Sequence, residues 1–532
     1  MNYLLGADAG TTSMKCMLIN EEGKEICLVN EYYDISFKKN SVLNNIIKNN
    51  INDEMDYANK IAMNFGIENS YISIVEFDAE GYWTTFKKAV QKVINLSKID
   101  PSHIRALAIS SQGETLICLD KNGKPLHNAI VWLDNRSTYE ALEIKNKFGE
   151  EKIYNKTGQP EITTTWPATK ILWLRNNEKE VFNQTYKFLL VGDYLNYKLT
   201  GKYCTDPSLS SSTLYLDIYE IKWWQDMLDF IGISESQLAD IRNSGETIGD
   251  ITEQACFETG LNHNTAVISG ALDQMAGLVG AGNIVSNIIT ETTGTCLAMC
   301  VNITNHIPYS VEYNIPCHLS ALPRKYSLLF WSQAAGAILE WFKNNFYGKE
   351  RITYNDIDCE ASKINPGSDG LILLPYFSGS AFPLFNPYAK GVLFGLTLNH
   401  TRAHIARTIM ESVGFILKEY IEIAEKIGVA HISEIRSLGG GSKSVLWNQI
   451  KADITGKEIV TLENPETSVL GAAMLAGIGV GVFKNLQDAS LKCVKMKERY
   501  YPNRLNYTVY ENAYNKYKDL INSIEHLFNV DV

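Results

Sequence analysis

The sequence predicts an α/β protein of two domains, on three observations. Strand-like apolar runs alternate with segments of helical periodicity, and 532 residues exceed what one hydrophobic core usually accommodates. The start of the chain and a segment of its second half also share one order of features: apolar run, small hydroxyl-rich loop, apolar run. This repetition indicates a duplicated architecture. We place the domains at residues 1–250 and 251–532, because turn residues and weak periodicity mark the stretch 245–260.

The first hydroxyl-rich loop lies at the start of the chain. One apolar run ends at Asp8 and another starts at Cys16, which predicts a β-hairpin with a phosphate-sized loop at its tip. Glycine lets the backbone approach a ligand, and N–H groups with hydroxyls can cradle phosphate oxygens, while Asp8 can hold a hydrated Mg²⁺ near them. An ordinary hairpin turn is the alternative. The loop residues are Gly10, Thr11, Thr12 and Ser13, with Lys15 just beyond.

The second loop repeats this pattern within residues 288–299 and contains Thr293, Gly294 and Thr295. Two phosphate loops that face each other across a cleft could grip one triphosphate from both sides. Neither loop is a Walker motif, because no G-x-x-x-x-G-K-[ST] string occurs. Neither is a dinucleotide fingerprint, since a strand and not a helix is expected after each loop.

The amino-acid composition indicates which kind of partner the protein binds and in which cellular compartment it is expected. The net charge of −11 argues against nucleic acid as the main partner, because phosphate neutralisation needs clustered Lys and Arg. The ten cysteines include no C-x-x-C pair and are typical of reduced cytosolic thiols. We expect no signal peptide, and the longest apolar run, residues 470–483, is too short and glycine-rich for a membrane span. The expectation is a cytoplasmic protein that binds a small molecule, with a homodimer as one possible assembly.

The coarse element pattern supports the α/β class. The pattern of residues 39–60 is typical of a solvated helix or an insert, and we assign this segment no role. We expect strands within 3–34, 104–110 and 266–269, helices at 84–96, 336–342, 402–427 and 445–454, and a terminal amphipathic helix over residues 514–528.

Asp273 is the candidate catalytic residue. It follows the strand expected at 266–269, in a stretch of small and apolar residues. One interpretation is an N-cap of the next helix. The other is a general base toward a substrate hydroxyl, since an aspartate with its usual pKa of about 3.9 is ionised and can accept a proton. Gln274 could fix another hydroxyl of the substrate.

A second cluster suits a polyol. Carboxylate and amide groups accept and donate hydrogen bonds to hydroxyls, and an indole can pack on the C–H face of a sugar. An edge-strand acid and a core tryptophan are the alternative interpretation. The residues are Gln112, Gly113, Glu114 and Trp132, with Asp134 and Arg136 nearby.

A third cluster is the triple glycine at 439–441, followed by Ser442 and an expected helix. Such a turn lets a base or ribose lie on the backbone, and a helix N-terminus favours phosphate. A glycine-rich turn alone is weak evidence, and its value comes from the two phosphate loops.

Together these motifs resemble the FGGY carbohydrate kinases, of xylulokinase-like type, within the actin and hexokinase superfamily. The likeness runs in order over nearly the whole chain. It is carried by residues 8–13, 167–174, 292–295, 391–411 (with Thr408 where Ala or Ser is usual), and 439–442 with Trp447 and Asp453.

The resemblance implies two ribonuclease-H-like, actin-like ATPase domains that flank a deep cleft, with ATP and Mg²⁺ as cofactors. It implies in-line transfer of the ATP γ-phosphoryl to a sugar hydroxyl, with Asp273 as the base and Gly336 and Glu340 near the adenine. The expected ATP-binding residues are Gly10, Thr11, Thr12, Ser13, Lys15, Thr293, Gly294, Thr295, Gly336, Glu340, Gly440, Gly441 and Ser442.

The substrate is where this chain departs from the family. Xylulokinases typically carry Met-His and glycerol kinases Arg-Glu where this chain has Gly113-Glu114. Glycine at 113 suggests space for a substrate larger than glycerol, and Glu114 would repel an anionic sugar acid such as gluconate. We therefore expect a neutral sugar, most simply a pentulose such as xylulose. Alternatives are ribulose, a hexulose, a glycerol-like polyol, or an actin-type ATPase scaffold without a sugar site.

Overall fold

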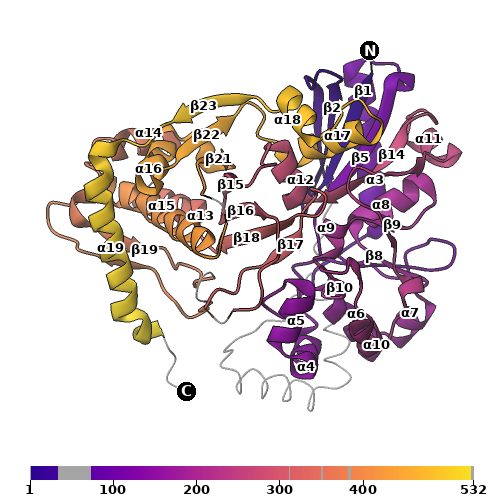
Figure 1. The fold of residues 1–532 in the computed structure, drawn as a ribbon, viewed down its shortest axis with the longest axis horizontal. Coiled ribbons are helices and arrows are strands. Elements are labelled where there is room, and N and C mark those ends of the chain that lie inside the picture. Colours follow the sequence, from indigo (N-terminus) through magenta and orange to yellow (C-terminus); the bar gives the residue numbers. More distant parts are fainter. Residues whose placement is uncertain are drawn as a thin grey trace.

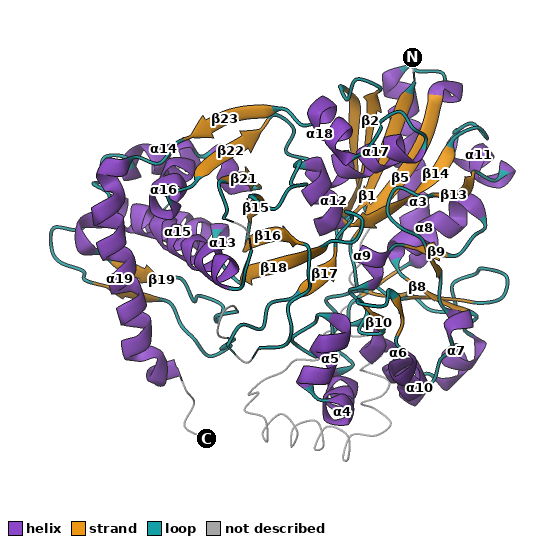
Figure 2. Ribbon diagram, in the orientation of Figure 1, coloured by secondary structure: helices purple, strands orange, loops and turns teal. Residues whose placement is uncertain are grey.

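The computed structural model describes residues 2–33, 74–310, 312–348, 352–381, 385–429 and 431–528. The described chain forms two halves side by side, each built on one large sheet with helices around it (Figures 1 and 2). The expected α/β class with two domains is confirmed. The segment 39–60, expected as a helix or an insert, lies outside the described residues.

The first sheet begins with the predicted hairpin. β1, β2 and β3 form an antiparallel meander, while β5 pairs parallel to β1, β14 parallel to β5, and β13 antiparallel to β14. The order across the sheet is β13 (Thr247–Asp250), β14 (Ala266–Leu272), β5 (Ile104–Ser111), β1 (Tyr3–Ala9), β2 (Ser13–Asn20) and β3 (Glu25–Tyr32).

The second sheet repeats this plan. β15, β16 and β18 form an antiparallel meander, and β21 and β22 add parallel strands beside β15. The order is β17 (Cys317–Leu319), β18 (Tyr326–Ser332), β16 (Leu297–Ile303), β15 (Ile288–Thr293), β21 (Glu434–Leu438), β22 (Glu458–Leu462) and β23 (Met496–Tyr500). The parallel trio β1, β5 and β14 therefore corresponds to β15, β21 and β22, which confirms the predicted duplication.

The expected helices form, with bounds shifted by a few residues. The helix expected at 84–96 begins earlier, because the side chain of Asp78 accepts from the Glu80 N–H and caps it. The helices are α3 (Ala79–Ser97), α4 (Thr138–Phe148), α5 (Glu150–Thr157), α6 (Pro167–Asn177), α7 (Lys179–Gln184), α8 (Val191–Thr200), α9 (Pro207–Ser210), α10 (Gln225–Ile231), α11 (Glu253–Thr259), α12 (Asp273–Gly280), α13 (Gly336–Phe346), α14 (Tyr354–Ala361), α15 (Arg402–Lys426), α16 (Val445–Thr455), α17 (Thr467–Gly479), α18 (Leu486–Cys493) and α19 (Tyr507–Ile524).

Smaller pairings join the segments between the sheets and their helices. They are β4 (Glu76–Phe77) with β7 (Ala129–Ile130), β6 (Ile117–Leu119) with β8 (Lys187–Leu189), β9 (Cys204–Thr205) with β12 (Asp240–Ile241), β10 (Leu216–Asp217) with β11 (Lys222–Trp223), and β19 (Ile372–Leu374) with β20 (Val392–Phe394).

Two elements from beyond the boundary expected at residue 250 belong with the first half. β14, from beyond that point, belongs to the first sheet. α17, from the C-terminal part of the chain, packs on β1 and β5 of the first sheet, where its yellow ribbon lies among indigo strands in Figure 1. The first sheet and the helix that covers it thus draw on both parts of the chain, and most of the apolar run at 470–483 lies in this buried helix.

A close contact between the halves is the crossing of α12 and α17. A Cβ on Gly280 would lie 1.9 Å from the Thr467 carbonyl oxygen, and a Cβ on Gly471 would lie 1.9 Å from the Ala276 carbonyl oxygen. Glycine at both positions lets the two backbones touch, which no larger residue permits without a shift of a helix.

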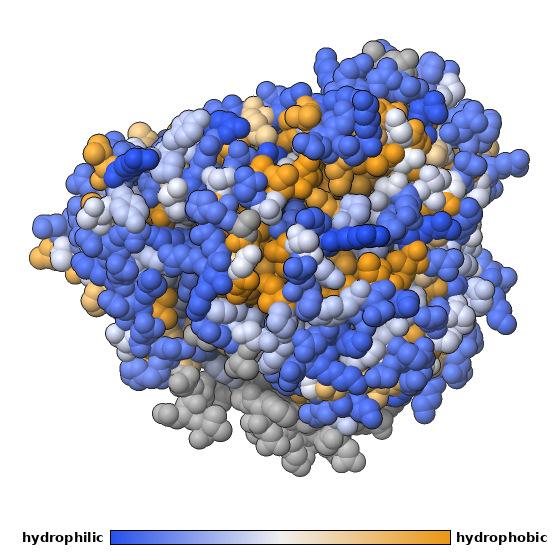
Figure 3. Space-filling view, viewed as in Figure 1, coloured by the Kyte–Doolittle hydropathy of each residue, from blue (hydrophilic) through white to orange (hydrophobic). Residues whose placement is uncertain are grey.

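A hydrophobic core spans this junction. It contains Leu272 at the end of β14, Cys300 on β16, Leu438 at the end of β21 and Leu470 on α17. On the face drawn in Figure 3, hydrophobic residues gather toward the middle, where the halves meet, and polar residues cover most of the rest. Among the described residues, no helix has the length and apolar character needed to cross a membrane.

Replacing Gly280 with alanine tests the crossing. The new methyl group must displace the α17 backbone, so we expect Gly280→Ala to destabilise the protein by about 1–3 kcal/mol despite alanine's better helix propensity. Gly277→Ala on the same helix meets only side-chain oxygens, the nearest at 3.3 Å, and should change stability much less. Denaturant unfolding of both variants measures the two changes in stability. Equal free energies of unfolding for the two variants would contradict the close crossing.

Candidate active site

Three carboxylates converge at the carboxyl ends of neighbouring parallel strands of the first sheet. Asp8 lies near the end of β1, Glu114 shortly after β5, and Asp273 directly after β14. Asp273 interacts electrostatically with both other acids, so the three side chains are close together. Ligands of open α/β sheets bind at this edge.

Asp8 is held by Ser110 and lies beside an ion pair that joins distant parts of the chain. Ser110, opposite it on β5, donates from its hydroxyl to Asp8 Oδ1 at 2.8 Å. Lys15, opposite Asp8 in the hairpin, forms an ion pair of 2.5 Å with Glu466, just before α17. Burial raises the pKa of Asp8 to about 6, although the Ser110 hydrogen bond and the Lys15 charge lower it.

Asp273 is the first residue of α12, and Leu272 occupies the N-cap position. The N-cap interpretation is therefore wrong, and the carboxylate stands at the start of the helix, where it accepts from the Gln274 N–H at 2.6 Å. Its carbonyl accepts from the Ser468 hydroxyl of α17 at 3.0 Å. Burial, reinforced by Asp8 and Glu114, raises the pKa of Asp273 to about 8, so the expectation of a simply ionised aspartate is wrong for the protein alone.

Glu114 has a left-handed backbone, with φ of 61°, which is uncommon for a residue with a side chain. Lys170 on α6 steadies this turn, because its ammonium donates to the carbonyls of Glu114 and Thr165, each at 2.7 Å. Burial raises the pKa of the Glu114 carboxyl and lowers the pKa of Lys170, while their mutual attraction opposes both shifts. Sequence reasoning included Lys170 in a family motif but assigned it no role.

The structure describes the surroundings of Gln112 and corrects the expectation for Gly113. Gln112 is buried, its amide nitrogen donates to the Tyr82 hydroxyl at 3.0 Å, and its Oε1 has no partner within the described residues. A Cβ on Gly113 would meet Ser212 Oγ at 2.8 Å and Leu272 Cδ1 at 2.9 Å. Glycine at 113 thus accommodates neighbouring protein atoms, and it provides no open space for a larger substrate.

Trp132 connects the second cluster to the first phosphate loop. Its indole N–H donates to Thr11 Oγ1 at 3.0 Å, and its ring is partly buried. The neighbouring Asp134 and Arg136 form a buried ion pair of 2.7 Å and are structural. Trp132 is therefore placed to contact both a substrate and the loop, while Gln274 is exposed.

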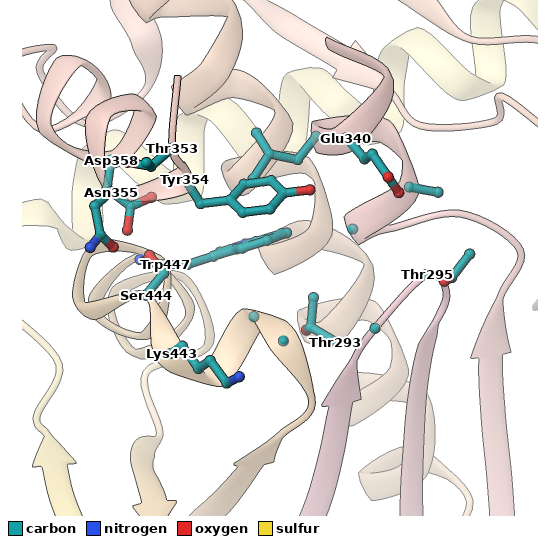
Figure 4. Close-up of a pocket in the computed structure, with 16 residues that line it drawn as sticks. Thr293, Thr295, Glu340, Thr353, Tyr354, Asn355, Asp358, Lys443, Ser444 and Trp447 are labelled. Atoms are coloured by element: carbon teal, nitrogen blue, oxygen red, sulfur yellow. Dashed lines mark hydrogen bonds between the residues drawn. The ribbon is translucent and has the colours of Figure 1, made fainter. Parts of the chain in front are cut away.

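A cavity of about 570 Å³ lies in the second half (Figure 4). The phosphate turn after β15 and the start of α13 form one wall, and α14 and the start of α16 form another. Tyr354 and Trp447 lie on one side of it in the close-up, with Thr293 and Thr295 on the other. The lining residues are Thr293, Gly294, Thr295, Gly336, Ala337, Leu339, Glu340, Thr353, Tyr354, Asn355, Asp358, Gly440, Gly441, Lys443, Ser444 and Trp447.

The glycine turn after β21 is packed against the phosphate turn. A Cβ on Gly441 would lie 2.7 Å from Thr293 Cβ, and Gly336, at the start of α13, donates to the Gly294 carbonyl at 2.9 Å. The two turns and the helix thus form one continuous surface. A flat ring with attached phosphates fits such a cavity, because its wall combines aromatic rings with backbone.

Most of the expected nucleotide residues of the second half line this cavity; Ser442 does not, since its hydroxyl donates to the Gly439 carbonyl at 2.8 Å. The first loop, Gly10–Ser13 with Lys15, does not line it either and stands at the acid cluster. Sequence reasoning missed the contribution of α14, including Thr353, Tyr354, Asn355 and Asp358. No motif marks these residues, and only tertiary packing brings them to the cavity.

The described side chains do not form a complete set of protein ligands for a metal ion. Across the ranges the structure describes, no group of three or more His, Cys, Asp or Glu side chains is arranged to hold a metal. Asp8 still fits a magnesium ion, because Mg²⁺ keeps several waters and is often bound through one or two carboxylates plus substrate phosphates. Burial is the main cause of the raised pKa values of Asp8 and Asp273, and a cation bound beside them would favour their ionised forms.

The whole chain is similar to carbohydrate kinases. Residues 50–280 and 293–480 match the N-terminal and C-terminal domains of the FGGY family of carbohydrate kinases. A xylulose kinase of Bacillus subtilis (strain 168) is 28% identical over 98% of this chain and 97% of its own, and a glycerol kinase of Saccharolobus islandicus (strain M.16.27) is 33% identical over 78% and 82%.

Solved structures give the same result. The ligand-bound xylulose kinase of Lactobacillus acidophilus has a TM-score of 0.82 and 27% identity, covering 99% of both chains. The gluconate kinase of the same organism has a TM-score of 0.83 and 26% identity, covering 98% of both. The fold of this chain is therefore that of the two-domain sugar kinases.

The raised pKa of Asp273 predicts a pH effect on stability. Its pKa rises from 3.8 to about 8 on folding, so the folded chain holds a proton that the unfolded chain loses, and stability falls as pH rises through this range. Asp273→Asn removes this contribution, and its melting temperature should exceed the wild-type value by more at pH 8 than at pH 5. Thermal melts without nucleotide and Mg²⁺ measure this, with exposed Asp229→Asn as control; parallel pH profiles would contradict it.

Proposed function

The chain belongs to the FGGY family of carbohydrate kinases, and we propose that it transfers the γ-phosphoryl of ATP to a hydroxyl of a neutral sugar, a pentulose such as xylulose. The observation that carries this proposal is the meeting of two sites at one junction. The acid cluster lies at the ends of β1, β5 and β14, the nucleotide-sized cavity follows β15 and β21, and one core joins β14 to β21.

We assign Asp273 the role of general base. It begins α12 at the junction, and the Gln274 N–H and the Ser468 hydroxyl fix its position. An ionised Asp273 accepts the proton of the sugar hydroxyl as that oxygen attacks phosphorus. Positioning supplies much of the rate in such a reaction, because both reactants are held in line before the bond forms.

We assign the nucleotide to the cavity of the second half. Gly294 and Thr295 would hold phosphate oxygens, the glycine turn at 440–441 would carry the ribose, and Glu340 and Tyr354 would border the base. The first loop, Gly10–Ser13, would complete the phosphate site when the two halves approach. Closure would also exclude water, which otherwise competes with the sugar for the γ-phosphoryl.

Magnesium would be held by Asp8 through water. When bound, Mg²⁺ supplies positive charge that neutralises the phosphates and favours the ionised form of nearby carboxyls. Ser110 and Lys15 prepare this position, because the first fixes one oxygen of Asp8 and the second balances its charge.

The electrostatics of the acid cluster support a neutral acceptor. Burial and the neighbouring acids already disfavour the ionised form of Asp273, so an anionic sugar acid would bring a further negative charge into a site that disfavours negative charge. The alternative substrates are ribulose, a hexulose or a polyol, and the relatives include a glycerol kinase and a gluconate kinase beside a xylulose kinase. Gly113 leaves no extra room for a larger substrate, because protein atoms fill that direction.

Two further proposals concern the chain as a whole. All ten cysteines are free thiols, which supports a reducing compartment such as the cytoplasm. We propose to divide the chain between α12 and β15 instead of at residue 250, because β14 belongs to the first sheet and the second family match begins at 293.

Asp273→Asn tests the catalytic role. The amide keeps the shape of the side chain but cannot take the proton, so we expect sugar phosphorylation to fall by ~10²–10⁴-fold while Mg·ATP still binds. Steady-state kinetics and calorimetry measure the two effects. Asp229→Asn, an exposed acid far from the cluster in sequence, is the matched control. Wild-type turnover in Asp273→Asn would show that another group serves as base.

A further inference from the structure

A fully buried ion pair lies behind the phosphate turn of the second half. The Lys451 ammonium is 2.6 Å from Glu291 Oε1, and both side chains have 0% exposure. Glu291 is on β15, just before the turn, and Lys451 is on α16. Neither residue lines the cavity, and neither belongs to the expected set of site residues.

The pair connects the phosphate turn, β21 and α16, which border the cavity. The second oxygen of Glu291 accepts from the Thr293 hydroxyl at 2.7 Å, and its first oxygen also accepts from the Ser437 hydroxyl of β21. Lys451 lies 5.5 Å from the ring centroid of Trp447, which lines the cavity. One buried carboxylate thus touches the phosphate turn, the neighbouring strand and the helix under the aromatic wall.

The same network reaches the glycine turn. The Ser437 hydroxyl is 3.1 Å from Asn448 Oδ1, and the Asn448 amide donates to the Ser442 carbonyl at 2.8 Å. Asn448 is itself fully buried. The orientation of both nucleotide turns is therefore fixed by hydrogen bonds that converge on Glu291.

We propose that the Glu291–Lys451 pair is a positioning element for ATP, which sets the phosphate turn at 293–295 in register with the glycine turn and Trp447. This inference rests on the proposed function, because it concerns how the nucleotide is held. Stability alone does not account for the pair, since an apolar pair of similar volume often stabilises a core equally well. Directional bonds to Thr293 and Ser437 provide what an apolar pair lacks, a fixed orientation of the turn.

Two double variants separate positioning from stability. Both Glu291→Leu/Lys451→Met and Glu291→Gln/Lys451→Met remove the ion pair without leaving a charge buried, but only glutamine keeps an acceptor for the Thr293 hydroxyl. We expect both to melt near the wild-type temperature. The leucine variant should raise KM for ATP about tenfold, the glutamine variant less, and neither should change KM for the sugar.

Two more variants complete the test. Lys457→Met removes a lysine from a pair with Glu425 whose members do not line the cavity, and should leave KM for ATP unchanged. Thr293→Val cuts the link to Glu291 while it leaves the ion pair intact, so it serves if the double variants fail to fold, and should raise KM for ATP in the same way.

Direct binding keeps this test independent of the proposed function. Calorimetry with Mg·ADP needs no sugar, so the affinity ratio between variants stands even if the wild type phosphorylates no sugar in the assay. Wild-type nucleotide affinity in Glu291→Leu/Lys451→Met or in Thr293→Val overturns the inference. Equal losses of affinity for ATP and sugar, together with a lower melting temperature, also overturn it, because they indicate a general structural role.

Discussion

The structure depends on the contact of two backbones, at the crossing of α12 and α17. Gly280 and Gly471 allow each helix to rest on carbonyl oxygens of the other, and no side chain separates them. α12 begins with Asp273, and α17 follows Glu466, which pairs with Lys15 beside Asp8. The crossing therefore sets the candidate base and Asp8, the aspartate proposed to hold magnesium, against the second half. A shift of one helix by the width of a methyl group would move both acids relative to the nucleotide cavity.

The duplicated sheets explain why chemistry gathers where it does. In each half, loops after neighbouring parallel strands carry the functional groups: Asp8, Glu114 and Asp273 in the first, the two nucleotide turns in the second. The halves use this plan differently. The first concentrates carboxyl groups and raises their pKa values, whereas the second buries Glu291 with Lys451 behind the turn at 293–295 and presents mainly backbone and aromatic surface to a ligand. One half is thus suited to a cation and hydroxyl groups, and the other to a nucleotide.

Local patterns in the sequence predicted the α/β class, the duplication and both hydroxyl-rich hairpin loops, and they identified Asp8, Glu114 and Asp273 as separate candidates. These features are encoded within short segments, so periodicity and turn chemistry reveal them. The contribution of α14, the hydrogen bond from Gln112 to Tyr82 and the packing around Gly113 were not predictable, because each depends on residues distant in sequence. The same holds for the raised pKa of Asp273, since burial and two distant acids cause it, and for the partner of Glu291, which lies on α16.

The central claim is phosphoryl transfer from ATP to a neutral sugar at the junction of the halves. Sugar-dependent ADP release by the wild-type protein tests it most directly, measured with Mg·ATP and a panel of xylulose, ribulose, fructose, glycerol and gluconate, with mass spectrometry of the sugar product. We predict that a neutral ketose, and xylulose most of all, stimulates ADP release and gains one phosphoryl group. ATP hydrolysis that no sugar stimulates would contradict the kinase assignment, and gluconate as the best acceptor would contradict the electrostatic argument from the three carboxyl groups.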